Sequence, residues 1–307
     1  MSTKKGRKIT LIGATGNVGH PTLSSLLSQN IHTLTVIQRS ESTSSFAPEV
    51  LVKKGPLDDE VFLLDALKDQ DVLVLQLPRT TLGIRPGLVR AAAKADVKYV
   101  LPVEWGTDPD ARIVEEFDRL VEKRALRQLI AEIGVSSWIA VVTNPWLDAG
   151  LSVGGWGIHI KERKATLWEG GNTKINTATL KRTGEATAAL LSLPETELEG
   201  FRNRTFFVSS CYVSQREIFE SVLRATKTAE AGWEVTTPRV EDVLRESDEA
   251  LKAGDLMRSF LDKYYMTHFR EGFGGDYNHK IDSRRLGFPD EDLDKVVAET
   301  LQSSQSA

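Results

Sequence analysis

Three glycines within seven positions, Gly13, Gly16 and Gly19, follow an apolar run near the start of the 307-residue chain. The run ITLIG (9–13) predicts a β-strand, and the leucine-rich stretch after the glycines predicts a helix. One glycine permits a tight turn out of the strand, a second lets a diphosphate approach the backbone, and a third lets the helix pack close to the sheet. The amides and dipole of the helix start favour an anion. The turn therefore predicts dinucleotide binding; the alternative is a glycine-rich turn that serves packing alone.

Short β-rich runs alternate with helical patterns through the first half of the chain. Expected strands cover 9–13, 32–37, 50–53, 72–77, 97–103 and 136–142, and expected helices cover 17–28, 59–68, 86–95 and 111–133. Strands that alternate with helices in this way form right-handed crossovers and a parallel sheet. The predicted fold class is α/β, with a Rossmann-type doubly wound parallel sheet.

The character of the sequence changes after residue 144, where a segment rich in Gly and Trp lacks a helical period. It predicts a long loop with short strands. A helix is expected at 179–194, a strand at 205–208, and mostly helical structure from 213 to 300. Pro289 and the acids after it suit the first turn of a last helix, and the tail 303–307 is expected to be disordered. The expected domains are a dinucleotide-binding Rossmann domain over 1–150, onto which the helix 179–194 packs back, and a smaller, mostly helical substrate-binding domain over 151–307.

Composition limits the partners. The formal net charge is −4, so no strong positive field favours nucleic acid or an anionic membrane. No apolar run approaches the roughly 20 residues of a membrane helix. The single cysteine, Cys211, indicates a reducing compartment, and a cytoplasmic location is expected. The five histidines lack metal-ligand spacing, so no metal is expected. The expected partner is a small-molecule substrate.

The residues after the second expected strand favour NADP over NAD. Arg39 stands twenty residues past Gly19, where an acid would hold the ribose 2′-hydroxyl of NAD, and a cation suits the extra phosphate of NADP. Lys53 and Lys54, after the next strand, could add positive charge, and Pro78, directly after the run 72–77, is also expected at the cofactor. The alternative for these cations is a solvated surface position.

Four motifs together resemble the NmrA-like and isoflavone reductase-like family of atypical short-chain dehydrogenases. They are GATGNVG (13–19), VIQR (36–39), VLPVEWGTD (100–108), and the stretch from EKRALR (122–127) to VVTNPW (141–146). The resemblance covers roughly residues 7–195. It implies that Thr15, Asn17 and Val18 hold the diphosphate together with the three glycines, and that Arg39 contacts the 2′-phosphate.

The same resemblance implies two further roles. Lys123 lies by the nicotinamide ribose and serves as the general acid or base, and Asn144 borders the nicotinamide pocket. The sequence has no Tyr-x-x-x-Lys pair of the usual short-chain dehydrogenase kind. Helical spacing places Lys123 beside an apolar face, where partial desolvation lowers the pKa of a lysine. The alternative is a surface lysine that keeps its amine in water.

Four residues are expected near the substrate. Glu104 follows the strand 97–103, at the sheet edge where such folds bind ligands, or it is a structural hydrogen-bonding acid. Trp146 and Trp156, with Trp168 nearby, either line a flat apolar pocket or form the core of the smaller domain. His159 could also face the substrate.

The stretch GLSVG (150–154) matches a hydrolase nucleophile elbow, but GWGIH follows it, which is a poor helix start, so a Ser152 nucleophile is not expected. The predicted function is an NADPH-dependent oxidoreductase of secondary metabolism that reduces a C=C, C=O or C=N bond of an apolar or aromatic small molecule. Two alternatives stay open. One is an NADP-binding redox sensor that acts through a protein partner, and the other is a rearrangement or isomerisation assisted by the cofactor.

Overall fold

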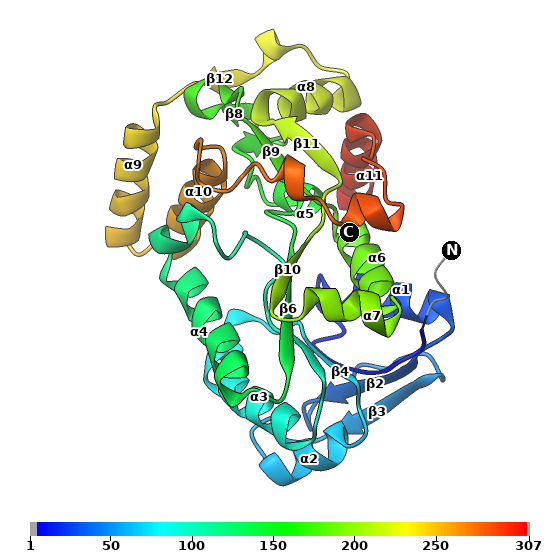
Figure 1. Cartoon of the computed structure of the whole chain (residues 1–307). Helices are drawn as coiled ribbons and strands as arrows, with labels where there is room; N and C mark the ends of the chain where they lie inside the picture. The colour runs from blue at the N-terminus through cyan, green and yellow to red at the C-terminus, as the bar shows by residue number, and fades with distance from the viewer. Residues whose placement is uncertain (1–4, 306–307) are drawn as a thin grey trace. The chain divides into compact units, whose positions relative to one another are not determined.

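A computed structural model, which describes residues 5–305, shows a seven-stranded sheet with the order β10-β6-β5-β4-β1-β2-β3 (Figure 1). The strands are β1 (Lys8–Ile12), β2 (Thr33–Gln38), β3 (Val50–Lys54), β4 (Val72–Leu75), β5 (Tyr99–Leu101), β6 (Ser137–Val142) and β10 (Arg204–Phe207). The pairs from β3 through β2, β1, β4 and β5 to β6 are parallel. The strand order reverses beside β1, which is where doubly wound folds bind their ligands. The predicted fold class is confirmed.

Helices cover both faces of this sheet. They are α1 (Gly19–Gln29), α2 (Glu60–Leu67), α3 (Arg85–Lys94), α4 (Asp118–Ile133), α6 (Leu180–Leu191) and α7 (Glu195–Leu198), with the short 3₁₀ helices η1 (Arg79–Ile84) and η4 (Glu199–Phe201). One apolar cluster joins α2, α3 and α4 to the sheet through residues such as Leu63, Leu88 and Ile130. Figure 1 shows α1 and α6 together on the opposite face. There a Cβ on Gly184 of α6 would lie 2.4 Å from the backbone of Pro21 in α1, so only glycine permits this close approach.

The chain divides into two compact units. Unit 1 consists of the chain up to Trp105, Phe117–Val142 and Lys181–Phe206, and unit 2 consists of Gly106–Glu116, Thr143–Leu180 and the chain from Phe207 onward. Each unit is therefore assembled from three separate segments. The sequence instead predicts two continuous domains that meet at residue 150, and this stays a prediction about which part folds independently.

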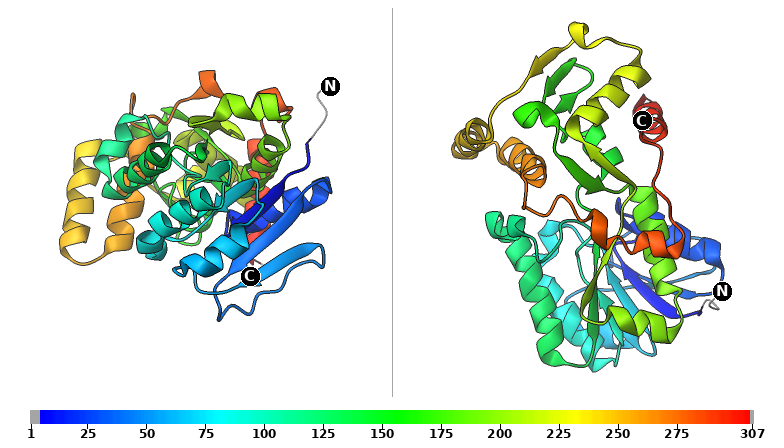
Figure 2. Two further views of the ribbon diagram at one scale, coloured as in Figure 1. Left: turned by 60° about the horizontal axis from the view of Figure 1, so that its bottom comes forward. Right: turned by 45° about the horizontal axis from the view of Figure 1, so that its top comes forward.

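Unit 2 combines small sheets with helices. Its strands are β7 (Ile158–His159), β8 (Lys164–Thr166), β9 (Lys174–Thr177), β11 (Cys211–Ser214) and β12 (Glu234–Thr236), and its α-helices are α5 (Leu147–Ser152), α8 (Gln215–Thr226), α9 (Val240–Lys252), α10 (Leu256–His268) and α11 (Leu293–Gln305). The 3₁₀ helices are η2 (Arg112–Glu116), η3 (Trp168–Gly171), η5 (Glu230–Gly232), η6 (Asn278–Lys280) and η7 (Ser283–Leu286). β9 pairs with β11, and β8 pairs with β7 and β12. Figure 2 shows α9 beside α10.

The single helix expected over 111–133 is wrong. The chain forms η2 and then α4, with Phe117 between them in an extended conformation (φ −141°, ψ 114°). The two pieces serve different cores: Ile113 is buried in unit 2, whereas Leu126 and Ile130 of α4 belong to the apolar cluster of unit 1. One straight helix cannot direct its apolar side chains into both.

The expectations for the C-terminal end need two corrections. The last helix begins at Leu293 rather than near Pro289, because Gly287 adopts φ +87° and the carboxylate of Asp292 accepts from the amide of Lys295. The helix then continues to Gln305, so residues 303–305 are helical instead of disordered. Residues 306–307 of the expected tail lie outside the described part of the chain.

Candidate functional site

In the turn after β1, internal packing requires glycine at two of the three glycine positions. Gly13 adopts φ +93°, and a Cβ there would lie 2.0 Å from the carbonyl oxygen of Gln76. A Cβ on Gly19 would lie 2.0 Å from the carbonyl oxygen of Gly13. Both positions therefore need glycine for the strand, the turn and α1 to meet.

Gly16 differs because the protein itself leaves room for a side chain there. Its nearest neighbour for a Cβ is the carbonyl oxygen of Gly13 at 3.4 Å, and its φ lies outside the left-handed region. Gly16, Thr15 and Asn17 are exposed, and Val18 is half-buried at the start of α1. An open face of bare backbone at a helix N-terminus suits a diphosphate, whose oxygens need close contact with amides. The residues of the turn thus fit a dinucleotide.

The end of β2 presents a buried acceptor and an exposed cation. The side-chain amide of Gln38 donates to the carbonyl of Ser44, but its Oε1 is buried and has no hydrogen-bond partner among the described residues. Arg39 follows with its side chain 69% exposed, 3.2 Å from the carboxylate of Glu41. Such an exposed pair is worth little, so the guanidinium of Arg39 can exchange Glu41 for a phosphate.

Lys53 is engaged elsewhere. Its Nζ donates to the carbonyl and the carboxylate of Asp65 in α2, at 2.8 and 3.2 Å. Lys54 donates instead to the carbonyl of Ser42, in the segment that follows Arg39. The predicted cofactor contact of Lys53 therefore has to compete with Asp65, and it stays a prediction.

The end of β4 supplies a second unpartnered acceptor. Gln76 donates to the hydroxyl of Thr22 at 2.8 Å, while its buried Oε1 has no partner among the described residues. Pro78 is exposed, and its carbonyl accepts from Arg85 at 2.8 Å. Burial lowers the pKa of Arg85, and the carboxylates of Glu122 and Glu104 oppose that shift. No motif in the sequence singles out Gln38, Gln76 or Arg85. The available signal was that Gln38 and Gln76 are polar residues at the carboxyl ends of strands.

Lys123, Glu104 and Arg127 meet in unit 1. Lys123 and Arg127 lie one turn apart on α4, and Glu104 follows β5. The carboxylate of Glu104, 3% exposed, is bound by Arg127, and the Nζ of Lys123 donates to the main-chain carbonyl of Glu104 at 2.6 Å. The Lys123 amine is 3.7 Å from the nearer oxygen of the Glu104 carboxylate. Arg127 occupies that carboxylate, which favours the structural role that the sequence left open for Glu104. The predicted substrate contact of Glu104 stays a prediction.

This arrangement leaves Lys123 as the reachable member of the three. Its side chain is 22% exposed, whereas those of Arg127 and Glu104 are 8% and 3% exposed. A lysine amine has three protons and can donate to more than one group at a time. A partly desolvated amine at a fixed position can act as an acid or a base.

Unit 2 contains the remaining predicted residues. Asn144 is buried with φ +52°, and its side-chain amide donates to the carbonyls of Asn176 and Gly275 at 3.0 and 2.9 Å. Its buried Oδ1 has no partner among the described residues, and the same holds for Nε1 of the half-buried Trp146. An acceptor and a donor without partners, two residues apart, suit contact with a polar ligand.

Trp156 is a core residue, so its expected substrate contact is wrong. It is 0% exposed, donates from Nε1 to the carbonyl of Leu147, and packs edge-on against Tyr265 at 4.9 Å. Trp168 belongs to the same apolar cluster. His159 is exposed on β7, and its ring packs where a Cβ on Gly154 would lie. Ser152 is the last residue of α5 and donates to the carbonyl of Asp148, so it is not on a strand-to-helix elbow.

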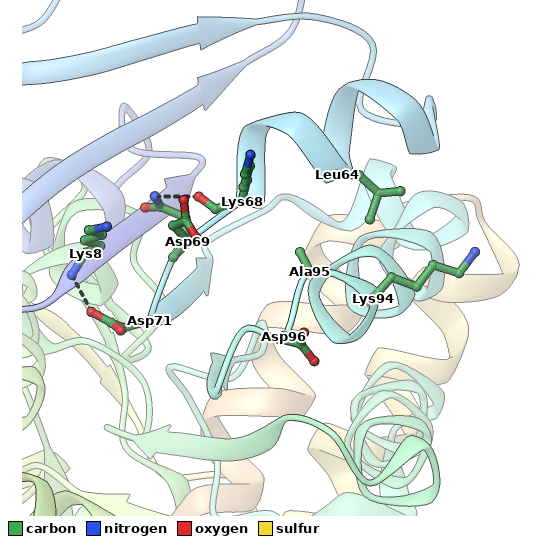
Figure 3. Close-up of a pocket in the computed structure, with 9 residues that line it drawn as sticks. Lys8, Leu64, Lys68, Asp69, Asp71, Lys94, Ala95 and Asp96 are labelled. Atoms are coloured by element: carbon green, nitrogen blue, oxygen red, sulfur yellow. Dashed lines mark hydrogen bonds between the residues drawn. The ribbon is translucent and has the colours of Figure 1, made fainter.

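A surface hollow of about 700 Å³ lies elsewhere on unit 1 (Figure 3). Its lining comes from the start of β1, the end of α2 and the end of α3, including Lys8, Asp71, Lys94 and Asp96. The amide of Lys8 donates to Asp71 at 2.8 Å. These are the amino ends of the strands, whereas the glycine turn, Arg39 and Gln76 follow their carboxyl ends. The hollow is therefore separate from the candidate cofactor site.

No group of three or more His, Cys, Asp and Glu side chains among the described residues is placed to hold a metal ion. Each helix in the described part of the chain is too short or too polar to span a membrane.

Comparisons with known proteins agree with the fold. Residues 5–146 match the model of the NmrA-like family. The oxidoreductase aprR of Aspergillus flavus is 26% identical over 306 residues, which cover 96% of this chain and 99% of aprR. A crystal structure of isoflavone reductase superposes with a TM-score of 0.76 at 18% identity, covering 96% of this chain and 99% of the other. The binary complex of leucoanthocyanidin reductase with NADPH from Vitis vinifera gives 0.73 at 16% identity, with the same coverage.

Proposed function

We infer that this chain, a member of the NmrA-like family over residues 5–146, is an NADPH-dependent oxidoreductase that reduces a C=C, C=O or C=N bond of an apolar or aromatic small molecule in secondary metabolism. The observation that carries the proposal is Gly16. The packing of the protein does not require a glycine there, whereas a bound diphosphate does. The oxidoreductase aprR matches along nearly its whole length, and the leucoanthocyanidin reductase of similar fold was solved with NADPH.

The choice of NADPH over NADH rests on Arg39. Its exposed guanidinium forms an ion pair with the exposed carboxylate of Glu41 and is available to a 2′-phosphate. The unpartnered Oε1 atoms of Gln38 and Gln76 are acceptors for hydroxyl or amine protons of the nucleotide. Thr15, Asn17 and Val18 would hold the diphosphate through the turn and the first amides of α1.

The bound cofactor supplies the hydride, and the protein has to manage the accompanying proton. Lys123 is our candidate for that role in unit 1. The carbonyl of Glu104 fixes the position of its amine, and the carboxylate of Glu104, 3.7 Å from that amine, is bound by Arg127. A positioned acid or base of this kind contributes roughly 10²–10⁴-fold to a rate.

We assign the polar atoms of Asn144 and Trp146 to ligand contact. The Oδ1 of Asn144 would accept from a carboxamide or another N–H group, and the indole N–H of Trp146 would donate to an oxygen. The ring of Trp146 is half-buried and offers an apolar surface to an aromatic substrate. The names of the relatives, isoflavone and leucoanthocyanidin reductases, belong to enzymes of aromatic compounds and favour the same class.

The test begins with calorimetry of NADPH and NADH against the purified protein. We expect tighter binding of NADPH, followed by loss of 340 nm absorbance with some member of a panel of aromatic ketones, enones and imines. Lys123→Met should lower kcat by roughly 10²-fold or more with the affinity for NADPH nearly unchanged. Lys94→Met, which removes an exposed lysine paired with Glu60, is the matched control.

Three outcomes separate the alternatives. Absence of binding for both nucleotides at millimolar concentration would refute the proposal. Tight binding without turnover on the whole panel would favour the redox-sensing regulator. Product formation without net consumption of NADPH would favour the rearrangement.

A further inference from the structure

Trp105 has a backbone conformation that a residue with a large side chain rarely adopts. It follows Glu104 in the segment after β5, and its φ is +31°. In the left-handed region a Cβ crowds the backbone, so the conformation costs free energy and persists only where the surrounding structure enforces it. Because Glu104 binds Lys123 through its main-chain carbonyl, the contacts that enforce this conformation bear on the position of the Lys123 amine.

The side chain of Trp105 is anchored to α6. The residue is 4% exposed, and its indole Nε1 donates to the hydroxyl oxygen of Thr187 at 3.3 Å. The hydroxyl of Thr187 donates its own proton to the carbonyl of Thr183, one turn earlier in α6, at 2.7 Å. The oxygen of Thr187 therefore meets the indole as an acceptor. Because Thr187 is fully buried, this bond fixes where the ring of Trp105 lies.

The peptide bond between Glu104 and Trp105 is held by α4. Its carbonyl accepts from Nζ of Lys123 at 2.6 Å, and the carboxylate of Glu104 is bound by Arg127. The amide of Glu104 donates to the carbonyl of Pro102 at 2.7 Å, which tightens the turn. Since α4 and α6 cover opposite faces of the sheet, two helices hold this short segment from two sides (Figure 1). All of these residues belong to unit 1.

The strained conformation can relax in two ways, and each of them breaks one of these contacts. A movement of Trp105 that makes its φ negative pulls the indole away from Thr187. A flip of the peptide also makes φ negative, but it turns the carbonyl of Glu104 away from Lys123. The two contacts therefore enforce the strained conformation together. Loss of the contact with Thr187 frees the carbonyl to which the amine is bound.

We propose that Trp105, held by Thr187, is a positioning residue for Lys123; the proposal rests on the oxidoreductase function proposed above. Trp105 and Thr187 act through the Glu104 carbonyl, which sets the place of the amine, rather than by contact with the substrate. A general acid or base has to lie within hydrogen-bond distance of the proton that it transfers, so a small displacement of the amine lowers the rate. The anchor should therefore affect kcat and leave NADPH binding unchanged.

The first experiment compares Thr187→Val, which keeps the shape and removes the acceptor, with Thr187→Ser, which keeps the hydroxyl. We expect Thr187→Val to lower kcat roughly tenfold on a substrate of the wild-type protein, with KM for NADPH unchanged, and Thr187→Ser to stay within about twofold of wild type. The matched control is Thr267→Val in unit 2, which removes a buried hydroxyl that also donates to the carbonyl four residues earlier, at 2.6 Å. Equal kcat in Thr187→Val and Thr187→Ser would overturn the proposal.

A second experiment asks whether the effect passes through the lysine. In a Lys123→Met background the amine is absent, so Thr187→Val should change the residual kcat by less than about twofold. A further loss of roughly tenfold in that background would show general damage to the fold and would overturn the positioning role.

A third readout needs no substrate. Carbon-13 NMR of the full chain labelled at the lysine Cε identifies the Lys123 signal by its absence in Lys123→Met. This signal should shift in Thr187→Val and return to its wild-type position in Thr187→Ser. An unchanged Lys123 signal in Thr187→Val would overturn the proposal even if the substrate panel yields no turnover. Absence of NADPH binding would instead refute the proposed function, and the NMR comparison would still decide whether Thr187 positions the amine.

Discussion

Among single residues, the three glycines of the first turn differ in why glycine is needed: Gly13 and Gly19 for packing within the protein, and Gly16 for the proposed diphosphate. Gly13→Ala forces a side chain into φ +93° and against the carbonyl of Gln76, so it should destabilise the fold by more than about 1–2 kcal/mol. Gly16→Ala should leave the melting temperature nearly unchanged and weaken NADPH binding about tenfold or more. Thermal unfolding and calorimetry of both variants test this. A Gly16→Ala protein that binds NADPH normally would contradict the assignment.

Arg39 and Glu41 form a second pair of residues with opposite expected effects. Arg39→Ala should weaken NADPH binding by about 10–100-fold and leave NADH binding nearly unchanged, because one charge-assisted contact is worth roughly 1.5–3 kcal/mol. Glu41→Gln removes the carboxylate that competes for the guanidinium and should tighten NADPH binding by a few-fold. Calorimetry with both nucleotides measures the change in preference. Equal weakening of both nucleotides by Arg39→Ala would show that the residue does not read the 2′-phosphate.

At the scale of elements, the buried ion pair of Glu104 and Arg127 connects the end of β5 to α4. Arg127→Met leaves a buried carboxylate whose main partner is lost, which costs on the order of 3–5 kcal/mol. The double variant Glu104→Gln with Arg127→Met removes the uncompensated charge and should recover part of that loss. Urea unfolding of the single and double variants checks the coupling. A double variant less stable than Arg127→Met alone would contradict it.

The contact between β5 and α7 should make stability depend on pH. Burial tends to raise the pKa of Glu195, but hydrogen bonds from Lys98, Arg7 and Tyr99 outweigh it and lower the pKa to about 2. A carboxyl with a folded-state pKa below its unfolded value of 4.5 stabilises the fold above that pH. This stabilisation is lost as the pH falls from about 4.5 towards 2. Urea midpoints of wild type and Glu195→Gln should therefore converge as the pH is lowered from 4.5 to about 2; parallel curves would contradict the assignment.

The sequence predicted elements well where local pattern and packing agree. The strands around β1 and β4, the glycine turn and the helix α6 follow from apolar runs and turn residues that act within one unit. The prediction of one helix over 111–133 was wrong because this stretch contains two apolar faces that pack in different units. The helical period alone does not show at which residue the first helix ends and the second begins. Phe117 is the residue at which the two faces separate.

The local conformation of the candidate site is predictable where a motif fixes the backbone, and less so where a side chain finds its partners far along the chain. The turn at 13–19 needs glycines for reasons that the sequence displays. The burial of Trp156 and the engagement of Glu104 by Arg127 depend on residues far along the chain, Tyr265 and the end of β5 among them. The hydrogen bond between Thr107 and His268 joins residues that are 161 positions apart, so no local sequence pattern predicts it.

At the scale of the whole molecule, the interleaved segments predict where the chain can be cut. Fragment 1–150 lacks α6 and β10, and it lacks Glu195, which binds Arg7, Lys98 and Tyr99. We expect fragment 1–150 to unfold without a cooperative transition, and fragment 1–206, which contains every segment of unit 1, to unfold cooperatively. Calorimetric scans of the two fragments measure this. Cooperative unfolding of fragment 1–150 would instead support a separate domain that ends at residue 150.

The late position of α6 and β10 also matters while the protein is being made. The central strands leave the ribosome first, yet the helix that covers α1 and the strand that flanks β6 follow only after residue 180. At about 5–20 residues per second, several seconds of translation separate the nascent β6 from its neighbour. During that interval the growing polypeptide presents an uncovered apolar sheet, which is the kind of surface that chaperones hold.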